Sequence, residues 1–224
     1  RMKIQSKLSS DLKISRIITG LWQMADIERE EDIDPKAYSE KIIPYVEAGL
    51  TTFDMADHYG SSELIVGEYN INNSTSDVQL LTKWVPKPGK VDKQSVSDAV
   101  QLALDRMKQT SIDLMQYHAW HYPDPSWLDA LFYLTELKQE GLIKNIGVTN
   151  FDAAHLRVAC ASGIPIVSNQ ISNSLIDQRA NSSKIIDVCN EYGIKLLAYG
   201  VVMGGFLTNK WLNKNEPKPE NLKT

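Results

Sequence analysis

The sequence predicts an α/β fold in which parallel strands and covering helices form a (β/α)8 TIM barrel. Short β-branched or apolar runs alternate with longer amphipathic stretches along the chain, which is typical of βα units and a parallel sheet. Polar residues stand at or just beyond the ends of most of the expected strands. The C-terminal ends of barrel strands converge on one face, where active sites are built, so this placement favours a barrel.

Each element follows from a local pattern. Residues 2–15 alternate around Ser9-Ser10-Asp11, which predicts an N-terminal β-hairpin that closes one end of the barrel. The expected strands are Ile17 to Gly20, Thr52 to Met55, Gln79 to Lys83, Asp113 to His118, Asn145 to Val148, Ile166 to Gln170 and Lys195 to Tyr199. The expected helices are Pro35 to Ala48, Ser62 to Tyr69, Lys93 to Lys108, Pro125 to Glu140, Phe151 to Ser162 and Asn181 to Tyr192. Glycines at 49, 141, 163 and 193 stand where a left-handed residue ends a helix.

An open, doubly wound sheet is the alternative arrangement of the same elements. A dinucleotide-binding sheet of that kind carries a glycine-rich turn after its first strand, whereas this strand runs into Gly20-Leu21-Trp22-Gln23-Met24. The composition does not change along the chain, which predicts a single domain over residues 1–224 with a polar tail at 213–224.

Charge and hydropathy exclude several classes of function. The chain has 24 Lys and Arg against 28 Asp and Glu, a net charge of −4, and no basic cluster, so a nucleic-acid surface is not expected. The longest apolar run, 196–207, contains three glycines and is shorter than the ~20 residues that cross a bilayer, so no membrane span is expected. Cys160 and Cys189 are expected to be free thiols in a reducing compartment, which predicts a cytoplasmic location.

Four polar residues form a set with a common chemistry. Tyr59 has an ordinary pKa near ~10, and an ammonium such as that of Lys83 lowers the pKa of a neighbouring tyrosine. Asp54 would keep Lys83 charged and in place, and a neutral His118 would donate a hydrogen bond to a carbonyl oxygen. This set fits proton delivery to a carbonyl group that is being reduced.

Several stretches resemble the aldo-keto reductase superfamily, in the same order and at similar spacing. They are FDMADHYGSSELIVGE (53–68), LLTKW (80–84), SIDLMQYH (111–118), GLIKNIGVTNF (141–151) and AYGVVMGGFLTNK (198–210). The resemblance implies a (β/α)8 barrel with an N-terminal hairpin and the nicotinamide-dependent reduction of aldehydes and ketones. It implies that Tyr59 is the general acid, that Lys83 and Asp54 tune it, and that His118 orients the carbonyl group of a small-molecule substrate.

The resemblance also implies a cofactor site, with NADPH as the expected cofactor. Thr149, Asn150 and Gln170 correspond to the partners of the nicotinamide carboxamide, and Tyr199 corresponds to the residue that stacks on the ring. The pyrophosphate would lie against the backbone of Gly200, Val201, Val202, Met203, Gly204 and Gly205, with Lys210 at a phosphate oxygen. Trp22, Trp84 and Trp120 match positions that line the substrate pocket.

The chain departs from the family after Tyr199. The resemblance implies an eighth strand and helix, and no strand pattern follows that residue, so we expect a barrel truncated before its eighth strand, with two exposed sheet edges. The family's contacts with the adenosine 2′-phosphate lie in the part not found here, which leaves NADH open beside NADPH.

Other interpretations stay open at this point. A nucleotide-binding regulatory subunit on the same scaffold is one, and a lyase or aldolase that forms a Schiff base on Lys83 is another. The expected pairing of Lys83 with Asp54 disfavours the second, because it keeps the amine protonated. No metal site is expected, because His118 and His121 lack the further ligands that zinc requires. Asp57 and His58 are expected to point away from the catalytic set. The sequence carries no signal for an oligomeric state.

Overall fold

Seven parallel strands form one sheet in the computed structural model, which describes residues 4–25, 32–74, 77–119, 126–182 and 184–215. The strands are β3 (Thr19–Gly20), β4 (Thr52–Asp54), β5 (Gln79–Trp84), β6 (Leu114–Tyr117), β7 (Ile146–Thr149), β8 (Ile166–Ser172) and β9 (Lys195–Tyr199). Each overlaps an expected strand. Their order in the sheet is their order in the chain, whereas a doubly wound sheet reverses its order at a switch point. The predicted barrel architecture is therefore confirmed, and the alternative is wrong.

The N-terminal hairpin is also confirmed. Strands β1 (Gln5–Lys7) and β2 (Lys13–Ser15) pair antiparallel. The hairpin residues Leu8, Leu12 and Ile14 are buried in a cluster with Leu81 of β5, Leu114 of β6 and Leu197 of β9. Leu81 and Leu114 precede Lys83 and Gln116 by two residues, so they lie on the same face of their strands. The hairpin therefore covers the N-terminal end of the sheet's inner face and leaves the C-terminal end for the site.

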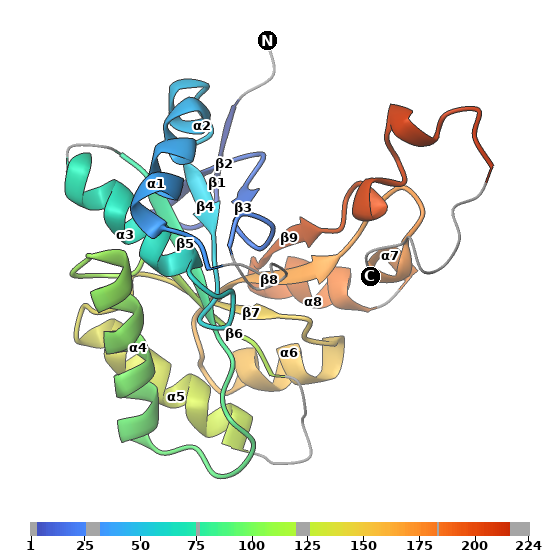
Figure 1. The fold of residues 1–224 in the computed structure, drawn as a ribbon. Helices are drawn as coiled ribbons and strands as arrows, with labels where there is room; N and C mark the ends of the chain where they lie inside the picture. The colour runs from blue at the N-terminus through green and yellow to red at the C-terminus, as the bar shows by residue number, and fades with distance from the viewer. Residues whose placement is uncertain (1–3, 26–31, 75–76, 120–125, 183, 216–224) are drawn as a thin grey trace.

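The helices are α1 (Pro35–Ser39), η2 (Glu40–Ile42), α2 (Ile43–Glu47), α3 (Ser62–Asn72), α4 (Lys93–Met107), α5 (Ser126–Gln139), α6 (Ala153–Ala161), α7 (Arg179–Ser182), α8 (Ile185–Tyr192), η3 (Met203–Gly205) and η4 (Asn209–Trp211). Helices α3, α4, α5 and α6 lie along the outside of the curved sheet (Figure 1). The expected helix 35–48 is broken into three pieces, because Pro44 near the start of α2 has no N–H for the helical hydrogen bond. The expected helix 181–192 is also wrong as a single element, since α7 and α8 replace it.

Short polar residues and glycines set the helix ends. The carboxylates of Asp34, Asp92 and Asp152 accept hydrogen bonds from backbone N–H groups in the first turns of α1, α4 and α6. The four glycines expected at helix ends have φ between 73° and 88°, the left-handed region that glycine adopts without steric cost.

The sheet does not close on itself among the residues described, because β3 and β9 each have one strand neighbour. A cleft of about 490 Å³ lies between the segment that leads into β3 and strand β9, lined by Ile17 and Ile18 and by Lys195 and Leu196. The architecture is thus a curled half-barrel, as expected for an incomplete (β/α)8 barrel.

Helices α3 and α4 cross at an unusually short distance. Glu63, Gly67 and Asn70 follow one stripe of α3 at helical spacing. A Cβ atom at Gly67 would lie 1.9 Å from the carbonyl oxygen of Arg106, and Asn70 Nδ2 donates to the carbonyl of Met107 at 2.7 Å. The stripe therefore fixes the last turn of α4 against α3.

Gly67→Ala is expected to lower the free energy of unfolding by about 1–3 kcal/mol, because the added methyl forces the two helices apart. Urea unfolding of both proteins measures the difference. Gly20→Ala is the matched control, since a Cβ atom there meets nothing within 4 Å. Equal stabilities for Gly67→Ala and the wild type would contradict the close crossing.

Candidate active site

A buried ion pair lies at the C-terminal end of the inner face of the sheet. Asp54 ends β4, and Lys83 of β5 is 1% exposed. Lys83 Nζ donates to Asp54 Oδ2 and, at 2.9 Å, to the carbonyl of Met55. Asp54 Oδ1 accepts from Gln116 Nε2 at 2.9 Å and from Gln170 Nε2 at 3.2 Å. Both carboxylate oxygens are thus bonded, which fixes the position of the ammonium.

Tyr59 lies in the turn between β4 and α3, against this pair. Lys83 Nζ is 4.7 Å from the centre of the Tyr59 ring, within the range of a cation–π contact. The Trp22 ring meets the Tyr59 ring edge-on, with the centroids 4.7 Å apart. The structure therefore brings Asp54, Tyr59, Lys83 and Trp22 together.

The pKa of Tyr59 corrects one expectation. Burial raises the pKa of Tyr59 above its ordinary value, the charge of Lys83 lowers it, and the charge of Asp54 raises it. The predicted effect of the ammonium is present, but the cost of an unsolvated phenolate outweighs it. The hydroxyl is thus protonated at neutral pH, the form that a proton donor requires.

His118 follows β6 and stays neutral at physiological pH. Burial, with the nearby charges of His58 and Lys83, lowers the pKa of His118 to about 4. The His58 and His118 ring centroids are 6.0 Å apart. A neutral imidazole carries one N–H, so His118 can donate a hydrogen bond to a carbonyl oxygen without competing as an acid.

The pKa of His118 makes stability depend on pH. An unfolded histidine has a pKa near 6.5, so between pH 6.5 and about 4 the unfolded chain binds more protons at this residue than the folded chain. We therefore expect the free energy of unfolding to fall as the pH is lowered through this window. His118→Asn removes that part of the slope, which urea unfolding at a series of pH values would measure. Equal slopes for the two proteins would contradict the assignment.

Two buried polar atoms border the predicted nicotinamide site. Thr149 Oγ1, at the end of β7, and Asn173 Oδ1, just beyond β8, have no hydrogen-bond partner within the part of the chain that the structure covers. Tyr199 Oη donates to Asn150 Oδ1 at 2.9 Å, and the Tyr199 ring is 42% exposed. An exposed aromatic face beside unsatisfied buried polar atoms fits a flat ring that carries an amide.

The predicted pyrophosphate loop follows β9 and leads away from the sheet (Figure 1). Gly200, Met203, Gly204 and Gly205 all have positive φ, so the backbone folds into tight turns with exposed residues at 200–204. Lys210 Nζ lies 5.3 Å from the centre of the Trp211 ring.

The other two tryptophans have different positions. Trp84 follows Lys83, so its side chain lies on the opposite face of β5, buried in the core beside Tyr117 at a centroid distance of 5.8 Å. It is not brought to the catalytic set. Trp120 lies outside the described residues.

Sequence reasoning missed Gln116. Its amide is fully buried and joins Asp54 to Gln170, whose Nε2 donates to Gln116 Oε1 at 3.2 Å. Its position in the sequence could have indicated this role. Gln116 is a polar residue within an apolar strand, and it precedes His118 by two residues, so both side chains lie on the same face of the strand.

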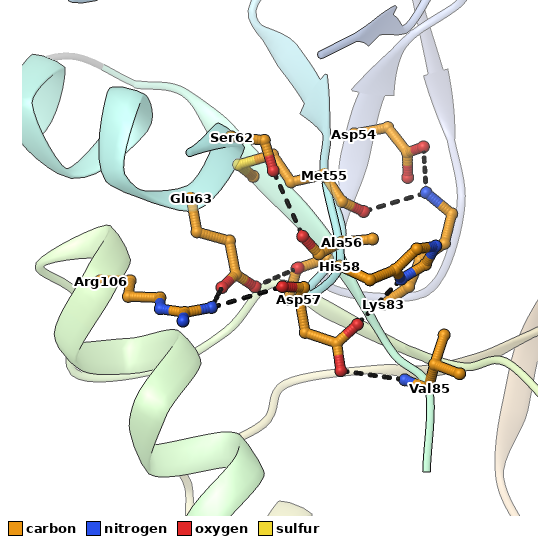
Figure 2. Close-up of polar contacts among 11 residues, drawn as sticks. Asp54, Met55, Ala56, Asp57, His58, Ser62, Glu63, Lys83, Val85 and Arg106 are labelled. Carbon is orange, nitrogen blue, oxygen red and sulfur yellow. Dashed lines mark hydrogen bonds and ion pairs between the residues drawn. The ribbon is translucent and has the colours of Figure 1, made fainter. Parts of the chain in front are cut away.

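Asp57 and His58 lie next to each other in the turn after β4, and the Asp57 carboxylate points toward Val85 (Figure 2). Asp57 Oδ2 accepts from the backbone N–H of Val85 at 3.1 Å, and Asp57 Oδ1 lies 2.9 Å from His58 Nδ1. The Asp57 carboxylate therefore bonds to the turn and to the end of β5 and not to the Asp54–Lys83 pair. The His58 ring centre, however, lies 4.8 Å from that of Tyr59 and 6.0 Å from that of His118, so the expectation that His58 points away from the catalytic set is wrong.

Across the described ranges, no three His, Cys, Asp or Glu side chains come together in a way that could hold a metal ion. No helix within them is long and apolar enough to cross a membrane.

Solved structures share this fold. The thermostable aldo-keto reductase Tm1743, in complex with the inhibitor epalrestat, superposes with a TM-score of 0.82 at 23% identity, over 93% of this chain and 76% of its own. The aldo-keto reductase of Bombyx mori, in complex with NADP, gives a TM-score of 0.72 at 22% identity, over 97% of this chain and 72% of its own.

Curated relatives agree with these structures. The chain is 26% identical to the chloroplastic pyridoxal reductase of Arabidopsis thaliana, over 77% of this chain and 52% of that protein. It is 27% identical to the NADH-specific methylglyoxal reductase of Escherichia coli K12, over 89% of this chain and 67% of that protein. The chain thus spans about half to two thirds of the length of these relatives. The family model for the Aldo/keto reductase family matches residues 16–224, and the chain belongs to this family.

Proposed function

We propose that the protein reduces an aldehyde or ketone to the alcohol with NAD(P)H, and that Tyr59 donates the proton. The observation that supports this most directly is the contact of the Tyr59 ring with Lys83, whose ammonium is held by Asp54. Curated relatives that are named as reductases support the reaction class.

Each residue of the set has one role in this reaction. Bound NAD(P)H supplies the hydride that reduces the carbonyl carbon. The neutral imidazole of His118 donates a hydrogen bond to the carbonyl oxygen and orients it. The Tyr59 hydroxyl gives its proton to that oxygen, and the Lys83 ammonium stabilises the negative charge that remains on the phenol oxygen. Asp54 keeps Lys83 charged and in place.

The cofactor is proposed to lie across the C-terminal ends of β7, β8 and β9. Thr149, Asn150, Asn173 and Gln170 offer polar atoms to the carboxamide, and Tyr199 offers a face to the nicotinamide ring. The backbone turns at 200–205 would lie against the pyrophosphate, with Lys210 near a phosphate oxygen. Trp22, packed against Tyr59, would form a wall of the substrate pocket. Both cysteines are free, which fits a cytoplasmic protein.

A Schiff-base reaction at Lys83 is disfavoured by the same geometry. The amine must lose its proton to attack a carbonyl carbon. Lys83 Nζ is fully enclosed and donates to both Asp54 and Met55, which stabilises the charged form.

The test is a fluorescence titration of the purified protein with NADPH and then NADH, followed by addition of 4-nitrobenzaldehyde while the absorbance of the reduced cofactor is recorded. We expect binding followed by oxidation of the cofactor. Binding without oxidation would support a nucleotide-binding regulatory protein instead. A lack of binding to either cofactor would contradict the proposed function.

A further inference from the structure

We propose that Arg106 of α4 is a positioning residue for the Tyr59 turn, and that it acts through Glu63 and the backbone carbonyl of Asp57. This inference rests on the proposed role of Tyr59 as proton donor. It concerns the ion pair of Glu63 and Arg106, which lies apart from the Asp54–Lys83 pair (Figure 2).

Arg106 contacts the turn on both sides of Tyr59. Its Nη1 atom lies 3.4 Å from the carbonyl oxygen of Asp57, two residues before Tyr59, and 3.4 Å from Glu63 Oε2, four residues after it. Both distances are long for hydrogen bonds, so the attraction is chiefly that of a cation for a carboxylate and a carbonyl dipole. One guanidinium group thus contacts the chain both before and after Tyr59.

Glu63 explains why a cation is needed at this place. Its side chain is 2% exposed, and its Oε1 atom accepts from Thr82 Oγ1 at 2.5 Å. Burial raises the pKa of the Glu63 carboxyl, and Thr82 and Arg106 lower it. A buried carboxylate is tolerated when it is paired and hydrogen-bonded, and Arg106 provides the paired charge. Because Thr82 precedes Lys83 in β5, the cluster also connects α4 to the strand that carries the catalytic lysine.

The backbone of Arg106 is itself fixed. The close approach of Gly67 to the Arg106 carbonyl and the Asn70 hydrogen bond to Met107 hold the last turn of α4 against α3. On its other side the turn is bonded to β5, because Asp57 N donates to the carbonyl of Lys83 at 2.9 Å. Arg106 therefore connects a rigid helix pair to the turn from the side opposite the sheet.

Loss of the guanidinium should let the Tyr59 turn shift without removing any group that reacts. A misplacement of about 1 Å in an active site lowers the rate of the chemical step by up to ~10²-fold. We expect Arg106→Ala to lower kcat about tenfold, within that range, with the Kd for NADPH unchanged because no proposed cofactor residue is touched.

The experiment compares Arg106→Ala with the control variant Arg157→Ala. The control removes an ion pair in which Arg157 of α6 lies 2.6 Å from Glu191 of α8, and both residues are far from Tyr59 in the chain. For each variant, kcat and KM for 4-nitrobenzaldehyde and the Kd for NADPH are measured with and without millimolar guanidine hydrochloride. Guanidine is expected to restore part of kcat in Arg106→Ala, because the Arg106 side chain is 31% exposed and its site is accessible, and to leave Arg157→Ala unchanged. An unchanged kcat in Arg106→Ala, or a loss that guanidine does not reverse, would overturn the inference.

A second variant and a second measurement keep the test decisive. Glu63→Gln keeps an acceptor for Thr82 and removes the charge that attracts Arg106, so it should reproduce the loss of kcat if Arg106→Ala does not fold. Amide hydrogen exchange of the peptide covering residues 57–63 can be measured without any enzymatic activity. It should be faster in Arg106→Ala and Glu63→Gln than in Arg157→Ala and the wild type. If the wild type reduces no aldehyde, the proposed function fails, while the exchange result still decides the role of Arg106. Equal exchange in all four proteins would overturn it.

Discussion

Tyr59→Phe should lower kcat for carbonyl reduction by about 10²–10⁴-fold, the range typical of a lost general acid. The variant removes one hydroxyl and keeps the ring that contacts Trp22 and Lys83. Burial keeps the pKa of Tyr59 above its ordinary value, so the hydroxyl carries its proton throughout the neutral range. Steady-state oxidation of NADPH with 4-nitrobenzaldehyde measures the loss.

The Tyr59→Phe substitution should slow the chemical step and leave cofactor binding unchanged. The proposed cofactor residues lie at the ends of β7, β8 and β9, and Tyr59 is not one of them, so the Kd for NADPH should not change. Trp22→Phe is the matched comparison, because it alters the other ring of the same contact and leaves the Tyr59 hydroxyl in place. We expect it to affect KM more than kcat. A Tyr59→Phe protein with normal kcat would rule out the proposed proton donor.

The fold could be predicted in detail because its signals are local. Alternation between apolar runs and amphipathic stretches located all seven strands, and glycines at 49, 141, 163 and 193 located helix ends, because each feature depends on the nearest residues. The break at Pro44 also has a local cause, since proline removes a helical hydrogen bond.

The site could be predicted only in part. Asp54, Lys83 and Tyr59 come together because strand ends and the following turns converge at one end of the inner face of the sheet, which the strand assignment already implies. The placement of Trp84 in the core follows from its alternation with Lys83 along β5. The contact between Glu63 and Arg106 depends on how α3 and α4 cross, which no local pattern specifies. The balance of burial against charge at Tyr59 likewise requires the packed structure.

Variants that break the buried Asp54–Lys83 ion pair should lower the free energy of unfolding strongly. Lys83→Met leaves the Asp54 carboxylate without its cation, and Asp54→Asn leaves the Lys83 ammonium without its anion. Breaking a buried pair from either side typically costs about 3–5 kcal/mol, because an uncompensated charge remains in a dehydrated place. We expect each single variant to lose about this much free energy of unfolding, measured by urea unfolding at pH 7. Lys144→Met is the control, since it breaks a pair whose lysine is 53% exposed and should cost about 0–1 kcal/mol.

The double variant Asp54→Asn/Lys83→Met separates stability from function. It removes both charges and keeps an amide that can bond to Gln116, so it should be more stable than either single variant, although no catalytic activity should return. A double variant as unstable as the sum of the two singles would contradict the pairing. If instead stability recovers to the wild-type value and reduction does not, a neutral pair stabilises the fold as well as the ion pair does. In that case the role of the ion pair is chemical, because only a charged Lys83 stabilises the phenolate that Tyr59 becomes after it has given up its proton.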